Sequence, residues 1–252
     1  MRVAGIQHDV VWEDGPATRA RLEPQLEAAA GAGARLVVLT EMFPTGFSME
    51  PERVAEPEGG PTTDWMRAQA AGLGVWLAGS VPITPDGGGR PVNRLLLAGP
   101  GGELHHYDKI HPFTYSGEHE HYAAGTERIT VGVDGVRLTP FVCYDLRFAD
   151  EFWAEAPDTD CYVVVANWPA ARRAHWQALL VARAIENQAY VVGVNRVGEG
   201  GGLHYAGDSR IVDPLGEVLA AGAGGETILL ADVDPSVVAE TRKRFPFLAD
   251  RR

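Results

Sequence analysis

Short apolar runs rich in valine, leucine and isoleucine, each bounded by turn residues, are the feature that most constrains the fold of this chain. Runs of this length and composition are typical of β-strands. Helical stretches lie between several of them, which favours an α/β protein with helices packed outside mixed sheets over an all-parallel barrel. The predicted strands span residues 3–7, 36–40, 75–80, 93–97, 129–133, 136–142, 162–166, 190–194, 209–212 and 227–232.

Three segments between these strands have helical character. Residues 16–30 are rich in alanine, leucine and glutamate, although Pro24 is a residue that usually interrupts a helix. Residues 62–71 follow a proline, which is favoured at a helix start. Residues 173–188 repeat apolar side chains at spacings of three and four, the period of one helix face.

The glycine-rich segments indicate turns within one domain rather than linkers between domains. Residues 85–91 and 198–202 are short and lie between apolar runs, which predicts hairpin tips or loops. Asp134 and Gly135 separate two predicted strands and are typical of a two-residue hairpin turn. Since a single α/β domain can reach about 250 residues, we expect residues 1–252 to form one domain.

The charge of the chain argues against two classes of partner. The formal net charge is -12, whereas nucleic acids and anionic membranes require a basic surface. No run approaches the roughly 18 apolar residues of a membrane span. The N-terminal segment also lacks the apolar run and small-residue cleavage site of a signal peptide. These features predict a cytoplasmic protein.

Three chemically useful side chains follow apolar strands directly. Glu41 follows one strand, Lys109 lies behind the run ELHHYD, and Cys143 follows the strand RLTPFV. Because α/β enzymes place their chemistry at the carboxyl ends of strands, the three are candidate site residues. Each also has an ordinary interpretation, as a surface acid, a surface lysine or a buried structural cysteine.

Cys143 is the better candidate nucleophile of the two cysteines. A helix can begin at Asp145, which would place Cys143 on a tight strand-to-helix turn where backbone N–H groups point at an oxyanion. A helix N-terminus also favours the thiolate. Cys161 opens an apolar run and fits a structural role. Two cysteines are too few for a disulfide framework or a four-cysteine zinc site.

Together the segments RLVVLTEMF, HHYDKIHPF and FVCYDLRF resemble the carbon–nitrogen hydrolase, or nitrilase, superfamily. The resemblance covers nearly the whole chain. The NWP run at 167–169, the segment HWQALLVARAIENQ and the GDSR run at 207–210 are similar to the omega-amidase branch, and in particular to its bacterial members. This resemblance implies a four-layer α-β-β-α sandwich of the nitrilase type, commonly assembled as a homodimer or a higher homo-oligomer.

The resemblance also implies roles for the residues at the strand ends. Glu41, Lys109 and Cys143 match the Glu–Lys–Cys triad of the superfamily in its chain order. Glu118 has the place of the family's second glutamate, seven residues before a glycine, whereas the spacing of the neighbouring Glu120 does not match. The backbone N–H of Tyr144 and the ammonium of Lys109 would hold the oxyanion. The reaction passes through a cysteine thioester and needs neither a metal nor a cofactor.

The implied substrate is a small-molecule amide, the omega-amide of a short dicarboxylic and preferably α-keto acid. Its far carboxylate would need a cation, for which Arg172 or Arg173 is a candidate, and its methylenes an apolar wall. For Arg147 we expect a structural ion pair instead, because CYDLRF occurs in relatives with other substrates. The candidate wall residues, most of which could equally pack in the core, are Phe43, Tyr115, Tyr144 and Trp168.

Other functions stay open at this point. The same triad serves the hydrolysis of nitriles, N-carbamoyl amines and other aliphatic amides in related proteins. A non-catalytic binding protein could keep the fold, although the triad is intact here. Redox chemistry at Cys143 ranks last, because no C-x-x-C pair is present.

Overall fold

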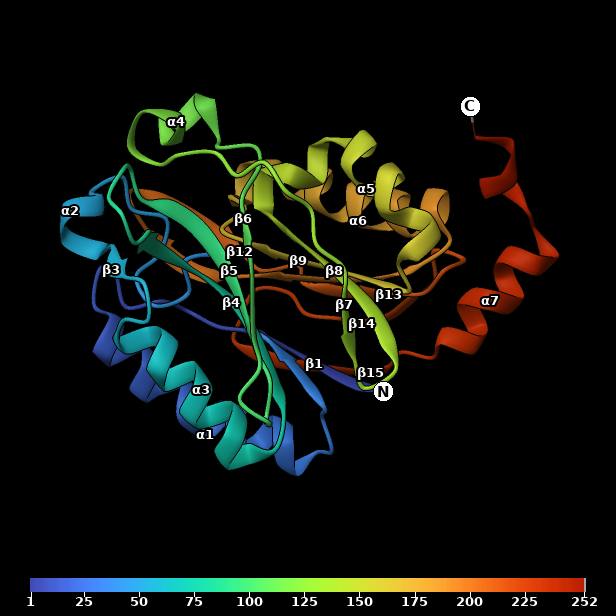
Figure 1. Ribbon diagram of the computed structural model, residues 1–252, viewed down its shortest axis with the longest axis horizontal. Coiled ribbons are helices and arrows are strands. Elements are labelled where there is room, and N and C mark those ends of the chain that lie inside the picture. The colour runs from blue at the N-terminus through green and yellow to red at the C-terminus, as the bar shows by residue number, and fades with distance from the viewer. Residues whose placement is uncertain (252) are drawn as a thin grey trace.

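Two β-sheets pack face to face in the computed structural model, which describes residues 1–251 (Figure 1). The strands of the first sheet are β1 (Arg2–Gln7), β2 (Leu36–Val38), β3 (Glu56–Pro57), β4 (Trp76–Thr84), β5 (Val92–Ala98), β6 (Leu104–Asp108) and β15 (Thr227–Asp232). They are arranged in the order β15-β1-β2-β4-β5-β6, with β3 paired to β4. β1, β2 and β4 are parallel neighbours, and the other main pairings of this sheet are antiparallel.

The second sheet has six strands in the order β14-β13-β10-β9-β8-β7. Its strands are β7 (Val131–Val133), β8 (Val136–Val142), β9 (Cys161–Ala166), β10 (Tyr190–Asn195), β13 (Arg210–Val212) and β14 (Val218–Ala221). β8, β9 and β10 run parallel, so their carboxyl ends lie at one end of the sandwich. A separate two-stranded ribbon is formed by β11 (Val197–Gly200) and β12 (Leu203–Ala206).

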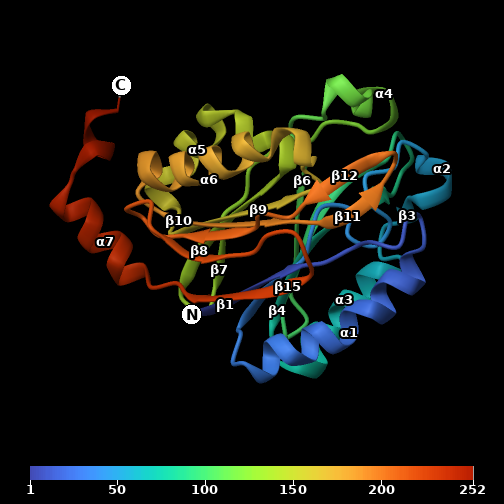
Figure 2. The ribbon, with the colours of Figure 1, turned by 180° about the vertical axis from the view of Figure 1, so that it is seen from behind.

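Helices cover the outer face of each sheet (Figures 1 and 2). The first sheet is covered by α1 (Gly15–Gly31) and α3 (Pro61–Leu73), and the second by α5 (Ala149–Glu155) and α6 (Arg173–Asn187). The remaining helical segments are α2 (Pro51–Val54), α4 (Glu118–His121), α7 (Pro235–Arg244), η1 (Thr114–Ser116), η2 (Cys143–Arg147), η3 (Ala156–Asp158), η4 (Ala170–Arg172) and η5 (Phe247–Asp250), where η denotes a 3-10 helix. The four layers confirm the predicted α-β-β-α sandwich.

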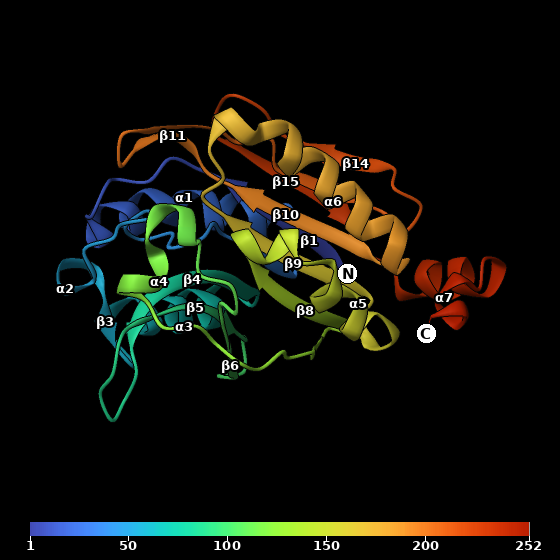
Figure 3. The ribbon, with the colours of Figure 1, turned by 90° about the horizontal axis from the view of Figure 1, so that it is seen from above.

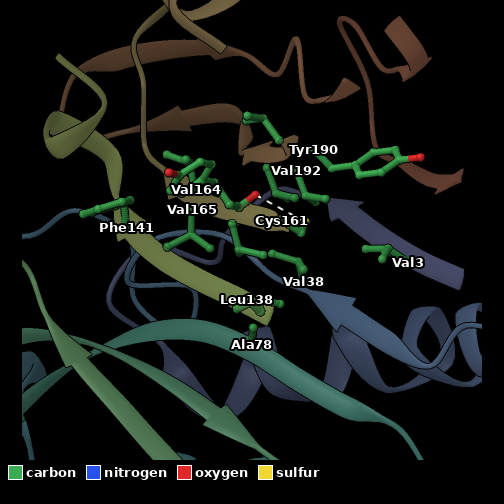
Figure 4. Close-up of a cluster of buried hydrophobic side chains, with 14 of the residues drawn as sticks. Val3, Val38, Ala78, Leu138, Phe141, Cys161, Val164, Val165, Tyr190 and Val192 are labelled. Carbon is green, nitrogen blue, oxygen red and sulfur yellow. Dashed lines mark hydrogen bonds between the residues drawn. The ribbon is translucent and has the colours of Figure 1, made fainter. Parts of the chain in front are cut away.

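The alternation of side chains along the strands divides the core into two parts. In β2, Leu36 and Val38 belong to the cluster that joins the two sheets, whereas Val37 belongs to the cluster under α1 and α3. Figure 4 shows the first of these clusters, in which Val38 and Ala78 of the first sheet lie near Leu138 of the second. A core of this extent fixes the strand ends, and therefore the loops that follow them.

The predicted elements match the structure at most positions. Helix α1 continues through Pro24 from Gly15 to Gly31, and an Asp14 carboxylate accepts the Ala17 N–H at its start. Asp134 and Gly135 have positive φ values of 46° and 82° and close the two-residue turn between β7 and β8, as predicted. Residues 85–91 and 198–202 lie at the β4–β5 and β11–β12 turns. Within residues 1–251, no helix combines the length and the apolar character needed to cross a bilayer.

Candidate active site

The ends of strands from both sheets meet at one end of the sandwich. In Figure 3 the carboxyl ends of β8 and β10 point to the end that carries α2 and α4, opposite α7. Lys109 directly follows β6, Cys143 directly follows β8, and Glu41 lies three residues behind the end of β2. Each of these residues therefore lies at or close behind the carboxyl end of a strand, as predicted from the sequence. The packing of the two sheets brings these strand ends together.

Lys109 lies between two buried carboxylates. Its Nζ is 2.9 Å from an Oε atom of Glu41 and 2.8 Å from one of Glu118, and all three side chains are almost completely buried. Burial alone would lower the pKa of Lys109, but the charges of Glu118 and Glu41 outweigh it and raise that pKa above its usual value. Burial, with the nearby Glu41 charge, raises the pKa of Glu118, although Lys109 opposes this. Lys109 is therefore a fixed cation at neutral pH.

Glu41 is held by hydrogen bonds from two asparagines. The Asn93 side chain donates to one carboxylate oxygen at 2.8 Å, and the backbone N–H of Asn167 donates to the other at 2.8 Å. Ser80 in turn donates to the Asn93 carbonyl at 2.7 Å, which fixes the orientation of the amide. Ser80 and Asn93 were missed in the sequence, yet a signal was present: each is a polar residue inside a buried and mainly apolar strand.

Glu118 and Glu120 differ sharply in environment. Glu118 is fully buried, binds Lys109, and accepts a short hydrogen bond from the Phe113 backbone N–H. The Glu120 side chain is 71% exposed and lies beside His119. Glu118, the glutamate predicted from its spacing to Gly125, is thus the one that faces the other site residues. The one-turn helix α4 points Glu118 inward and Glu120 outward.

Cys143 is the first residue of η2 and has a φ of 47°, an uncommon conformation for a residue with a side chain. The sharp turn exposes part of its side chain to a cavity. Burial, followed by the Glu41 charge, raises the pKa of the Cys143 thiol well above its usual value despite the opposing charge of Lys109. The backbone N–H of Tyr144 lies in the first turn of η2, where such groups have no acceptor within the helix.

Asp145 connects the Cys143 turn with the Lys109 segment. Its fully buried carboxylate accepts the Val142 N–H at 3.0 Å, the His111 N–H at 2.9 Å and the Tyr107 hydroxyl at 2.8 Å. Val142 immediately precedes the cysteine, and Tyr107 and His111 flank the lysine on either side. Asp145 is therefore a positioning residue for both.

We expect Asp145→Asn to reduce both turnover and stability, because an amide would present its NH₂ group to backbone N–H donors. Leaving such buried groups unpaired should cost roughly 1–3 kcal/mol in the free energy of unfolding. Urea unfolding and the rate of ammonia release measure the two effects. Tyr107→Phe removes only the bond from the Tyr107 hydroxyl and should have a smaller effect on both. Unchanged turnover in Asp145→Asn would show that Asp145 does not position the cysteine.

A cavity of ≈ 240 Å³ opens beside Cys143. Its volume is smaller than the roughly 300–1,000 Å³ typical of drug-sized ligands, which restricts it to a short molecule. Among the wall residues predicted from the sequence, Tyr144 and Trp168 line it. The other cavity residues are Phe47, Met49, Phe113, Ser116, Arg147, Asn167, Pro169, Arg172, Gly201, Leu203 and Tyr205.

Two of the predicted wall residues lie elsewhere. Phe43 is fully buried in the cluster between the first sheet and its helices, where it packs against Trp65 and the backbone of Gly79. Tyr115 is 86% exposed at the surface of η1. The aromatic residues in their place are Phe47 and Phe113. The prediction chose the two correct loops but the wrong aromatic residue in each. A loop has no regular period, so the sequence does not show which of its side chains points into the cavity.

The three candidate arginines also separate in the structure. Arg173 makes a two-bond ion pair with Asp208, at 2.7 and 2.9 Å, and does not line the cavity. Arg172 lines it, with its guanidinium 5.3 Å from the Phe113 ring centroid. Arg147 lies over the Trp168 ring at 4.7 Å and contacts His175, so the expected structural ion pair is wrong. Neither Arg147 nor Arg172 forms an ion pair within residues 1–251.

A four-layer sandwich with glutamate, lysine and cysteine side chains at converging strand ends defines a hydrolase of the nitrilase type. Residues 2–243 match the family described as carbon-nitrogen hydrolase, and the chain belongs to this family of enzymes that act on carbon–nitrogen bonds. The described residues hold no group of three or more histidine, cysteine or carboxylate side chains suited to a metal ion.

Individual relatives are similar over nearly the full length. The chain is 45% identical to omega-amidase YafV of Escherichia coli (strain K12), covering 99% of this chain and 96% of that protein. It is 34% identical to the 2-oxoglutaramate amidase of Bacillus subtilis (strain 168), over 87% and 85% of the two chains. The crystal structure of XC1258 from Xanthomonas campestris, a CN-hydrolase superfamily protein, superposes with a TM-score of 0.94 at 42% identity, covering 100% and 97%.

Proposed function

We propose that this protein hydrolyses the omega-amide of a small dicarboxylic acid, preferably an α-keto acid, and releases ammonia. The observation that carries the proposal is the pair of arginines, Arg147 and Arg172, that line the Cys143 cavity without an ion pair in residues 1–251. Two guanidinium groups beside an amide-cleaving centre suit an amide whose other end is a carboxylate. The similarity to omega-amidase YafV and to a 2-oxoglutaramate amidase supports the same substrate class.

The proposed reaction begins with proton transfer from the Cys143 thiol to Glu41. The sulfur then attacks the amide carbon, and the resulting oxyanion is held by Lys109 Nζ and the Tyr144 backbone N–H. Glu41 returns the proton to the amide nitrogen as the C–N bond breaks, so ammonia leaves and a thioester stays on Cys143. A water molecule deprotonated by Glu41 attacks the thioester, and the acid product leaves as the thiol is restored.

Glu118 acts in this proposal through its position. Its carboxylate binds Lys109 at 2.8 Å and so keeps the ammonium directed at the oxyanion site. The charge of Glu118, joined by that of Glu41 whenever Glu41 holds no proton, keeps Lys109 protonated, which is required of an oxyanion donor. The apolar part of the substrate would lie against Trp168, Phe47 and Phe113, which are lining residues of the cavity.

The proposal is tested by comparing a monoamide of a short dicarboxylic acid with an amide of equal length that ends in a methyl group. We expect kcat/KM to be at least about a hundredfold higher for the acid, because losing an ionic partner for a desolvated carboxylate typically costs 2–5 kcal/mol. Equal kcat/KM values for the two substrates would show that the cavity does not recognise a carboxylate, and the enzyme would then be a general aliphatic amidase.

Arginine variants identify the pocket itself. Arg172→Met and Arg147→Met should each lower kcat/KM for the acid substrate and leave the methyl-terminated amide nearly unchanged. Arg173→Met is the matched control, since Arg173 is the adjacent residue but pairs with Asp208 outside the cavity. The acid preference should fall with rising ionic strength, because salt screens the guanidinium charges. Arg173→Met should keep the acid preference.

Related activities and the assembly are part of the same proposal. A panel of nitriles, N-carbamoyl amines and simple amides tests the alternative members of this reaction class, and we expect slower turnover of each.

We further propose that residues 1–252 act as one catalytic domain and that the enzyme is a cytoplasmic homodimer or higher homo-oligomer, as is common among proteins of the nitrilase superfamily. Sedimentation velocity measures the oligomeric state directly.

A further inference from the structure

Tyr205 differs in its hydroxyl from three other buried tyrosines. Tyr107, Tyr122 and Tyr162 are each at most 1% exposed, and each donates its hydroxyl proton to an acceptor in the protein: Asp145, the Ser48 carbonyl and the Phe152 carbonyl. Tyr205 is 2% exposed, yet within residues 1–251 its hydroxyl has no hydrogen-bond partner. Since buried tyrosine hydroxyls are usually paired, this one is available to a ligand.

The place of Tyr205 indicates which ligand. It lies on β12 and lines the cavity that also contains Cys143 and Arg172. Figure 2 shows the β11–β12 ribbon reaching toward the end of the sandwich that carries α2 and β3, the end at which the catalytic strand ends meet. Tyr144 also lines the cavity, but its side chain is only half-buried, so Tyr205 is the buried tyrosine of this cavity whose hydroxyl is uncommitted within residues 1–251.

The ring of Tyr205 is fixed from behind. The Arg196 guanidinium lies 4.7 Å from the ring centroid and is itself fully buried. Arg196 is held by Asp9 at 2.8 Å and by the carbonyl oxygens of Val197 and Glu199 at 3.1 and 3.0 Å. A Cβ at Gly200 would come within 2.7 Å of this guanidinium, so the glycine-rich hairpin makes room for it. A ring held in this way loses little conformational entropy when its hydroxyl binds a substrate.

The hydroxyl is a donor at neutral pH. Burial raises the pKa of Tyr205 to about 12, although the Arg196 charge opposes this, and the charges of Glu41 and Cys143 act in the same direction as burial. The charge of Arg172 opposes this rise. A protonated phenol offers its O–H to an anionic or carbonyl oxygen and adds no charge of its own.

We propose that Tyr205 is a specificity-determining residue whose hydroxyl donates a hydrogen bond to the acid end of the substrate, beside Arg172. The inference rests on the proposed function, since it requires a substrate with an oxygen acceptor at the end remote from the amide. Arginine supplies charge and the phenol supplies a directed neutral donor, so together they fix the orientation of the acid end and the reach of the amide toward Cys143.

Tyr205→Phe tests this with a change of one oxygen atom. For the dicarboxylic monoamide we expect KM to rise about 10–100-fold with kcat changed less than threefold, the range of one hydrogen bond to a charged group. For the methyl-terminated amide of equal length, both constants should be unchanged. The dicarboxylate product should lose inhibitory strength by the same factor as the substrate loses affinity. Tyr162→Phe is the matched control, because it removes a buried hydroxyl that lies outside the cavity and should not change KM.

The possible outcomes separate this inference from the function on which it rests. If wild-type enzyme prefers the acid substrate and Tyr205→Phe keeps that preference and the product inhibition, Tyr205 has no such role and the proposed function stands. Equal losses on both substrates would also overturn the role, since they would indicate a structural effect that a melting temperature can verify. If wild-type enzyme shows no acid preference at all, both proposals fail together.

Discussion

Cys143→Ala should abolish ammonia release, whereas Cys161→Ala should keep most of it. Cys143 is at a turn with a φ of 47° and faces the cavity, beside the Glu41 carboxylate and the Lys109 ammonium. Removing the nucleophile of a covalent mechanism typically costs more than ~10⁴-fold in kcat, because the remaining groups can stabilise only the uncatalysed attack of water. The measurement is ammonia release at saturating substrate.

The Cys161 variant is a demanding control because each cysteine adjoins an apolar strand: Cys143 follows β8 and Cys161 begins β9. Cys161 is fully buried in the cluster between the sheets, where Figure 4 shows it among valine side chains, and its Sγ contacts the Tyr162 carbonyl at 3.7 Å. Burial raises the pKa of this thiol, so it stays protonated and unreactive. Truncation to alanine removes the buried Sγ atom and should lower the free energy of unfolding by roughly 1 kcal/mol. Turnover in Cys143→Ala within tenfold of wild type would place the nucleophile elsewhere.

The sequence is most informative where strand periodicity fixes direction. The strand that precedes Cys143 could be predicted from an apolar run, whereas β6 before Lys109 has the mixed sequence LHHYD. The packing of the two sheets brings the ends of these strands together. The hairpin at Asp134 and Gly135 was predictable because only a few residue pairs adopt two positive φ values easily. These are local rules, and they hold here.

The directions of loop side chains and of long side chains could not be predicted from the sequence. Phe43 and Phe47 stand four residues apart in one loop, but Phe43 packs on Gly79 whereas Phe47 lines the cavity. Arg147 was expected in an ion pair, but the nearest partners in space are the Trp168 ring and His175. Such outcomes depend on segments far apart in the chain, so no local pattern encodes them.

Glu41→Gln should reduce turnover at pH 7 nearly as far as loss of the nucleophile does. Glutamine keeps the shape of the side chain, and its one oxygen can still accept the hydrogen bonds from Asn93 and Lys109, although its NH₂ group would then face the Asn167 N–H. It cannot take the proton of the Cys143 thiol. The thiol will not ionise by itself at this pH, because burial is the largest cause of its raised pKa and persists in the variant. Formation of the thioester and its hydrolysis both require the base, so both steps should fail.

The residual rate of Glu41→Gln should rise with pH. Replacing Glu41 removes one of the charges that raise the pKa of Cys143, so the pKa falls but remains above the usual value as long as burial dominates. Thiolate then forms only as the pH rises, and the residual rate of Glu41→Gln should increase about tenfold per pH unit from pH 7 upward, whereas wild type needs no prior ionisation. The melting temperature serves as the control that the variant is folded, and alkylation of Cys143 by iodoacetamide should accelerate with pH as the residual rate does, because both need the thiolate. A stoichiometric burst of ammonia at the wild-type rate, with a thioester seen by intact mass, would mean that Glu41 does not activate the cysteine and that another group accepts its proton.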